Sequence, residues 1–313
     1  MRILFTGASS FSGFWFVREL AGAGHEVTAT FRRSPGEYEG EGPRALRVGL
    51  LPKYCRAIHG LAFGDEGFLA LARQEAWDLL AHHAADVTDY KSPNFEVARA
   101  LQNNTRDLAR VLEALRAGGC RRVLLTGSVF EGDEGAGSEG LPHFSPYGLS
   151  KALTAQAFRF YCGRAGMSLG KFVIPNPFGP FEELRYTAYL MKSWLSGKTA
   201  TCASPSYVRD NIHVSLLAKS YVRFAQELPP RPGFSRINPS GYAESQGAFT
   251  HRLAEEMRSR LKLPCAVELK AQTDFPEPRI RINTDPADGR LLGWDESAAW
   301  DDFARYYQEL QAA

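Results

Sequence analysis

Residues 2–13 read RILFTGASSFSG, a short apolar run followed by a turn of small residues. A helical pattern then covers residues 14–23, and residues 25–31, HEVTATF, are rich in strand-forming residues. Strand, small-residue turn, helix and strand in this order are typical of the opening of a dinucleotide-binding unit, where the free N–H groups of a helix N-terminus face a pyrophosphate. The sequence therefore predicts an α/β fold whose first turn binds a nucleotide.

The turn supplies the candidate cofactor contacts Gly7, Ser10, Phe11 and Gly13. Gly7, Ser10 and Gly13 follow the spacing of a glycine-rich fingerprint, with a small residue at the middle position. Glycine-rich turns after strands also have purely structural uses. The prediction therefore depends on the strand and helix that flank the turn.

The end of the second predicted strand indicates which dinucleotide is bound. An acidic residue there would accept a hydrogen bond from the ribose 2′-OH and repel a 2′-phosphate. This chain instead has Phe31 followed by Arg32 and Arg33, and guanidinium groups match phosphate geometry. NADP(H) is therefore favoured and NAD(H) stays possible; the alternative is that both arginines are solvated surface residues.

The next predicted strand ends supply further candidate contacts. Residues 34–62 predict a loop with uncertain inserted structure. Gly64-Asp65 is predicted either to end the third strand, with Asp65 at the adenine, or to form a turn. A strand at residues 79–83 is followed by Ala84-Ala85, small side chains that would let the cofactor approach the sheet.

Residues 145–151, SPYGLSK, can hold a phenol and an ammonium one helical turn apart. Ser145 as N-cap and Pro146 at the first helical position begin a helix, so Tyr147 and Lys151 share a face. A nearby ammonium stabilises phenolate, which would lower the pKa of Tyr147 and suit acid–base work on an alcohol or carbonyl. On spacing alone, an ordinary solvated helix face is the simpler interpretation.

The remaining pattern continues the alternation of strands and helices. Helices are predicted at residues 67–75, 94–118, 147–166, 185–196, 215–227, 244–261 and 296–311, and strands at 122–128, 171–174, 208–214, 236–238 and 266–269. Ser128 ends its strand on the side where open α/β sheets bind ligands. The prolines of residues 175–180 end regular structure sharply. We predict a dinucleotide-binding domain of residues 1–175 plus about 208–240, and a smaller lobe of about 176–207 and 241–313.

Composition limits the partners. The 313 residues are 44% hydrophobic and 23% charged, and a net charge of +2 gives no broad basic surface for nucleic acid. No apolar run approaches the roughly 18 residues of a membrane span, and no signal peptide is recognisable, so we expect a cytoplasmic protein. The five cysteines are widely spread, and His82 and His83 would point to opposite faces of a strand, so no metal site is predicted.

Together these stretches resemble the extended short-chain dehydrogenase/reductases, a family of NAD(P)-dependent nucleotide-sugar epimerases, dehydratases and reductases. The matching pieces, in family order, are residues 6–13, 82–85, 103–104, 126–128, Tyr147 with Lys151, 176–180, 209–214 and 292–294. The resemblance implies a Rossmann-type doubly wound parallel sheet with a smaller, mixed α/β C-terminal substrate lobe. It also implies a homodimer formed through helices 94–118 and 147–166.

The resemblance assigns roles to individual residues. Tyr147 is similar to the family's general acid/base, Lys151 to the residue that lowers its pKa and holds the nicotinamide ribose, and Ser128 to the hydroxyl that orients the substrate oxygen. Asn104 matches an asparagine that supports a water near the lysine, with a helix-end hydrogen bond as the alternative. The positions that resemble contacts to the sugar nucleotide are Asn176, Arg209 and either Arg279 or Arg281.

Departures from the family pattern limit the reaction. Dehydratases place an acidic pair directly after a threonine at the end of the serine strand, whereas Gly127 and Ser128 follow Thr126 here. Epimerases that act beside a 4-keto group use an extra Cys or His pair, and Val129 and Phe130 occupy that neighbourhood. Of the family's reactions, hydride transfer at one carbon of the sugar is the one that these departures leave possible.

We therefore expect an NADPH-dependent reductase of a keto sugar nucleotide, because the two arginines suggest the NADPH pool. The alternative is a C4-type nucleotide-sugar epimerase with bound NAD. A non-catalytic NAD(P) sensor on the same fold is a third, less favoured interpretation.

Overall fold

A seven-stranded parallel sheet forms the centre of the protein. In the computed structural model, which describes residues 1–312, its strands run in the order β11-β7-β5-β4-β1-β2-β3. They are β1 Arg2–Thr6, β2 Glu26–Phe31, β3 Arg56–His59, β4 Leu79–His82, β5 Arg122–Ser128, β7 Ser168–Ile174 and β11 Gly233–Ile237, and every pairing between them is parallel. The predicted Rossmann-type fold class is confirmed.

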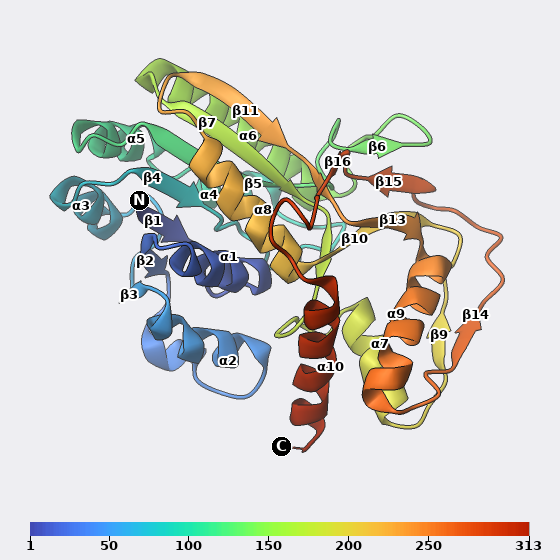
Figure 1. Ribbon diagram of the computed structural model, residues 1–313. Coiled ribbons are helices and arrows are strands. Elements are labelled where there is room, and N and C mark those ends of the chain that lie inside the picture. Colours follow the sequence, from blue (N-terminus) through green and yellow to red (C-terminus); the bar gives the residue numbers. More distant parts are fainter. Residues whose placement is uncertain (313) are drawn as a thin grey trace.

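Helices cover both faces of this sheet (Figure 1). Helices α1 (Phe11–Gly22) and α8 (Val214–Glu227) share one hydrophobic core with Ile3 and Phe5, whereas α3 (Glu66–Gln74), α5 (Leu108–Ala117) and α6 (Pro146–Ala165) share the other with Leu4. Because neighbouring residues of β1 face opposite cores, the strand is apolar throughout rather than alternating. Continuous apolar runs such as residues 3–5 therefore predict strands of such a sheet.

A second part of the chain lies beyond the carboxyl ends of these strands, at the right of Figure 1. Its sheet has the order β13-β10-β15-β6, with β8 added beside β10. These strands are β6 Ala136–Gly137, β8 Asn176–Phe178, β10 Val208–His213, β13 Tyr242–Ser245 and β15 Ile280–Ile282. The short pairs are β9 Ala200–Cys202 with β14 Val267–Leu269, and β12 Pro239–Ser240 with β16 Asp285–Pro286.

Three helices complete this second part: α7 (Tyr186–Leu195), α9 (Gln246–Leu261) and α10 (Glu296–Ala312). They share a core that contains Trp194, Phe249, Trp300 and Phe303. Within residues 1–312, no helix is both long enough and apolar enough to cross a membrane. The predicted domain boundaries stay a prediction, and strand β10, which was expected in the first domain, lies in the second sheet.

Two predicted segments differ from the structure. Residues 34–62, expected as loop with uncertain inserted structure, contain a 3-10 turn at Pro35–Tyr38, helix α2 (Pro43–Leu50), a second 3-10 turn at Leu51–Lys53, and β3, which ends at His59. The helix expected at 94–118 is broken into α4 (Val97–Asn104) and α5, with Asp107 at φ 47°. A Cβ on Gly64 would lie 2.6 Å from the Arg106 carbonyl carbon, so the Gly64 turn packs directly on this break.

Candidate active site

The turn between β1 and α1 is shaped to let another molecule approach its backbone. Gly7 has φ +86°, and a Cβ there would lie 2.6 Å from the Ala84 nitrogen, so only glycine fits between the turn and the end of β4. Ser10 caps α1 by accepting the Gly13 N–H at 3.1 Å. The turn thus presents a capped helix N-terminus beside the small residues Ala84 and Ala85, an arrangement that can hold a pyrophosphate.

Partly buried polar contacts of His83 support this turn. The His83 ring reaches Ser10 Oγ (2.9 Å from Nε2) and Thr126 Oγ1 (2.9 Å from Nδ1). Since Ser10 Oγ donates to the Gly7 carbonyl, Nε2 is the protonated ring nitrogen and Nδ1 accepts from Thr126. Burial, helped by the Lys151 charge, lowers the pKa of His83 to about 3, so the ring stays neutral. No local sequence pattern predicts this support.

His82 and His83 do point to opposite faces. The Nδ1 atom of His82 lies 3.0 Å from Thr6 Oγ1, and its ring packs against Phe63 and Phe158 in the other core. One metal ion cannot bridge the two rings.

The predicted adenosine contacts lie after β2 and at the start of α3. Arg32 and Arg33 are exposed directly after Phe31, which is buried and stacks on His59. Asp65 caps α3 instead of ending a strand, because its two carboxylate oxygens accept the Phe68 and Ala62 N–H groups at 2.7 Å each. The turn alternative for Gly64-Asp65 therefore describes the structure.

An arginine that the sequence did not indicate also reaches this turn. Arg47 of α2 is fully buried, and its guanidinium donates to the Ser9 carbonyl (3.1 Å), the Phe181 carbonyl (2.6 Å) and Glu183 (2.5 Å). It ties the first turn to the segment that precedes α7. Its partners lie 38 to 136 residues away, so no local pattern marks it.

Tyr147 and Lys151 lie where the sequence places them, on the first turns of α6. Ser145 caps the helix by accepting the Gly148 N–H at 3.2 Å. Lys151 is 4% exposed, and its Nζ donates to the Thr126 carbonyl at 2.6 Å. Burial lowers the pKa of Lys151 to about 8. The ordinary solvated face is thereby excluded for the lysine.

The expected lowering of the Tyr147 pKa is wrong for this structure. Its ring lies against Tyr90 and Phe95, with ring centroids 5.5 and 5.9 Å away. This burial, followed by the charge of Glu131, raises the pKa of Tyr147 above its ordinary value. The physical reason is that desolvation of the phenolate prevails while the ammonium of Lys151 is turned to the Thr126 carbonyl.

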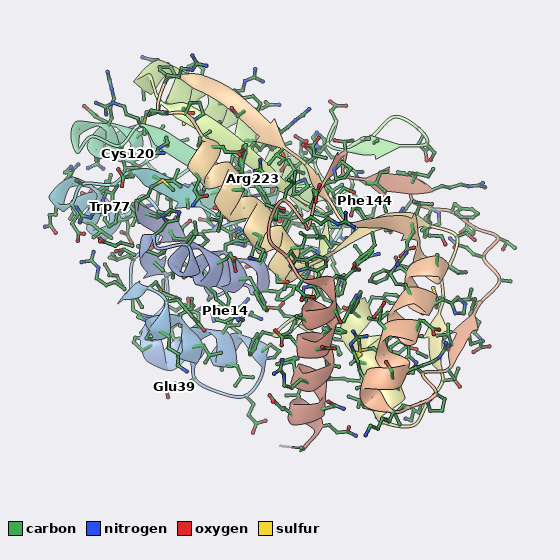
Figure 2. The ribbon with its side chains drawn as sticks, in the orientation of Figure 1. Phe14, Glu39, Trp77, Cys120, Phe144 and Arg223 are labelled. Carbon is green, nitrogen blue, oxygen red and sulfur yellow. The ribbon has the colours of Figure 1, made fainter. Side chains whose placement is uncertain are left out.

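Ser128 ends β5 and is brought to α6 by a close backbone approach. A Cβ on Gly148 would lie 2.8 Å from the carbonyl carbon of Phe130, so the first turn of α6 rests on the turn that follows Ser128. The Ser128 hydroxyl accepts the Phe130 N–H at 3.2 Å. In Figure 2, Phe144 lies close to the second sheet, and its ring stacks on Phe130 at the same turn.

Asn104 is the last residue of α4 and is buried. Its amide accepts the Asp86 N–H at 2.8 Å and donates to Thr154 Oγ1 at 3.2 Å. These bonds connect the segment after β4 to α6. They match the alternative prediction for Asn104, which was a hydrogen bond at a helix end. A water beside Lys151 stays a prediction.

The predicted sugar-nucleotide contacts lie in the second part of the chain. Asn176 donates to the Asp210 carbonyl at 3.1 Å. Arg209 pairs with Glu277 at 2.9 Å and lies over the ring of Tyr207, which together with Glu277 lines a groove of about 360 Å³. Arg279 is exposed over the ring of Phe275.

The structure separates Arg279 from Arg281, which the sequence left open. Arg281 is 2% exposed and donates to the carbonyls of Val129, Glu131 and Pro142. Each of its three guanidinium nitrogens donates to the loop after Ser128, and the side chain is buried. Of the two, Arg279 is the one free to reach a ligand.

Comparison with known proteins agrees with the fold described above. The chain aligns along 99% of its length, at 18% identity, with the UDP-glucose 4-epimerase of Thermotoga maritima with UDP-glucose (100% of that chain, TM-score 0.73). The UDP-N-acetylglucosamine 4-epimerase of Methanobrevibacter ruminantium M1 gives 18% identity over 99% of this chain and 98% of that one (TM-score 0.74). The dTDP-glucose 4,6-dehydratase of Streptomyces venezuelae, with NAD bound, gives 20% over 100% and 98% (TM-score 0.69).

At these sequence identities, the structural matches show that the fold is shared. A search of curated proteins finds no match. The model of the NAD dependent epimerase/dehydratase family matches residues 3–238, about three quarters of the 313 residues. The chain therefore belongs to the NAD dependent epimerase/dehydratase family.

Proposed function

We propose that the protein is a nucleotide-sugar epimerase that oxidises one hydroxyl-bearing carbon of the sugar and then reduces it again on the other face. NAD(P), when bound, takes up the hydride and returns it. The observation that supports the proposal is the close approach of Gly148 to the Phe130 carbonyl, which packs the first turn of α6, the turn that includes Tyr147, against the turn that follows Ser128. The turn from Gly7 to Gly13, which would hold the cofactor, follows β1, and β1 is separated from β5 in the sheet by β4 alone.

The chain's own groups divide the work. Tyr147 takes the proton of the sugar hydroxyl during oxidation and gives it back during reduction. Ser128 orients the oxygen that loses and regains this proton. Lys151, fixed to the Thr126 carbonyl, holds a positive charge at the base of the site. Asn176, Arg209 and Arg279 are the proposed contacts to the nucleotide sugar.

Two observations favour epimerisation over dehydration. Positions 127 and 128 carry no acid, and the nearby carboxylate of Glu131 is bound by Lys171. The family and the 4-epimerases among the structural neighbours support epimerisation over the net reduction that we expected from the sequence. UDP-hexoses are accordingly the first substrates to test.

NADP(H)-dependent reduction is kept as the second candidate because one observation favours it. Arg32 and Arg33 are exposed at the end of β2, the position where an acid would select NAD. These guanidinium groups are the proposed partners of a 2′-phosphate, so cofactor choice and reaction type have to be tested separately.

The experiment identifies the bound cofactor of the purified protein by mass spectrometry and then incubates it with UDP-hexoses, with and without added NADPH. An epimerase interconverts two UDP-sugars, separable by chromatography, without consuming reductant. Stoichiometric loss of NADPH with no second sugar would support the reductase instead. Tyr147→Phe is expected to abolish turnover, and a fully active Tyr147→Phe enzyme would contradict the catalytic assignment.

A further inference from the structure

A buried lysine lies between two buried carboxylates behind the serine strand. Lys171 of β7 is 6% exposed, and its Nζ contacts Glu131 Oε2 and lies 2.7 Å from Glu134 Oε1. The other Glu134 oxygen accepts from Asn238 at 2.9 Å and lies 3.4 Å from Arg236. Since removing one partner of a buried ion pair is strongly destabilising, the cluster is held as a unit.

This cluster contacts the turn that carries Ser128. The Glu131 carboxylate oxygen that does not contact Lys171 accepts the Ser128 N–H at 2.8 Å, and the Glu131 N–H donates to the Ser128 carbonyl at 3.0 Å. Arg281 binds the Glu131 carbonyl from the other side. The position of the Ser128 hydroxyl therefore depends on the position of one buried carboxylate.

Gly127 shows that the ion pair fills the space at the end of the strand. A Cβ on Gly127 would lie 2.7 Å from Lys171 Cε and 3.0 Å from Glu131 Oε1. An acidic side chain directly after Thr126 would need this same space. Both oxygens of Glu131 are already bound, so its carboxylate acts on neighbouring groups and does not act as a free acid.

The charges that face Tyr147 and Lys151 come from several elements. Tyr147 faces Glu131 from the turn after β5, Tyr90 from the segment after β4, and Arg185 before α7. Lys151 faces Glu131 and Lys171, and the neutral rings of His82 and His83 lie near it. After burial, Glu131 is the largest influence on both groups, and it raises the pKa of each.

We propose that Glu131 is a positioning residue of the active site: bound by Lys171 through one oxygen and by the Ser128 N–H through the other, its carboxylate fixes the turn that carries Ser128 and sets a negative charge there. The proposal rests on the proposed function of Tyr147 as the group that exchanges a proton with the sugar. Lys171 acts with the opposite sign, because its charge partly cancels that of Glu131.

The test is the pH dependence of kcat/KM in variants of opposite sign. Glu131→Gln removes a negative charge and is expected to move the ascending limb to lower pH by about 0.5–1 unit. Lys171→Met removes a positive charge and is expected to move the limb to higher pH. The double variant is expected to return close to the wild-type profile, and it keeps the test available where Lys171→Met alone does not fold. Coincident profiles for wild type, Glu131→Gln and the double variant would overturn the proposal.

Two controls separate position from charge. Glu131→Asp keeps the charge and shortens the side chain, so it is expected to lower kcat without moving the ascending limb of the pH profile. Glu139→Gln, an exposed residue of the same loop, is expected to leave both unchanged. An active Tyr147→Phe enzyme would refute the proposed function itself. If Tyr147→Phe is inactive but Glu131→Gln leaves the ascending limb of the kcat/KM profile unmoved, only the role of Glu131 is refuted.

Discussion

Gly148 offers the sharpest test of how the active site is assembled. Ordinary van der Waals contact begins near 3.4 Å, and a methyl group at Gly148 would lie 2.8 Å from the Phe130 carbonyl carbon, with the oxygen closer still. The obstacle is backbone, so Gly148→Ala must push α6 away from the turn by at least 0.6 Å. Tyr147 and Ser128 belong to the two parts that separate, and a displacement on the order of 1 Å at reacting groups costs about 100-fold in rate.

The expected result is a loss of kcat/KM of about 10- to 100-fold, with a loss of about 1–3 kcal/mol in the free energy of unfolding from overpacking. Epimerisation of a UDP-hexose and chemical denaturation measure the two effects. Gly163→Ala on the same helix is the matched control, because a Cβ there meets no atom within 4 Å. Replacing glycine in a helix interior with alanine stabilises by roughly 0.5–1 kcal/mol, so this control should keep full activity. Wild-type turnover in Gly148→Ala would refute the reasoning.

Four further changes test other parts of the argument. Gly7→Ala puts a methyl group 2.6 Å from the Ala84 nitrogen at φ +86°, so cofactor affinity, measured by calorimetry, should fall by about tenfold or more, equivalent to roughly 1.4 kcal/mol. Arg33→Asp should raise the ratio of kcat/KM for NAD(H) over NADP(H) by about tenfold, and an unchanged ratio would contradict a 2′-phosphate contact. Burial raises the pKa of Glu182 to about 8, so the protonated carboxyl stabilises the fold below pH 4.5 and this contribution is lost as pH rises through 8; Glu182→Gln should flatten the pH dependence of the melting temperature across that window. Light scattering should give twice the 34.7 kDa chain mass, and Phe160→Asp, at a side chain 58% exposed on α6, should halve it if this helix forms the dimer.

The sequence predicted well the elements that local pattern determines. Strand β5 has the predicted bounds of residues 122–128, and α6 begins at Pro146 with Ser145 as its N-cap, as the two residues predict. Both signals lie within a few residues of the element that they define. Turn chemistry and capping residues act locally, so they can be recognised without the fold.

The failures share a different physical origin. Helix α2 is short and carries its one buried residue, Arg47, against partners from the first turn and from the segment before α7. The break between α4 and α5 packs on Gly64, more than forty residues earlier in the chain. Lys171 looked like one more residue of a strand, because the two carboxylates that it binds come from a loop. Tertiary contacts determine each of these three features, and such contacts produce no periodic pattern in the sequence.

Spacing could place Tyr147 and Lys151 on one helix face, but it could not decide whether that face was solvated. Two glycines lie next to the proposed catalytic residues Tyr147 and Ser128. Gly148 lets α6 rest on the Phe130 carbonyl, and Gly127 leaves room for the Lys171–Glu131 pair on the same turn. The turn that carries Ser128 therefore makes two close contacts, and a Cβ at Gly148 or at Gly127 would break one or the other. Tyr147 is partly buried and its pKa is raised, so its proposed acid–base role depends on the charges around it more than on the i, i+4 lysine alone.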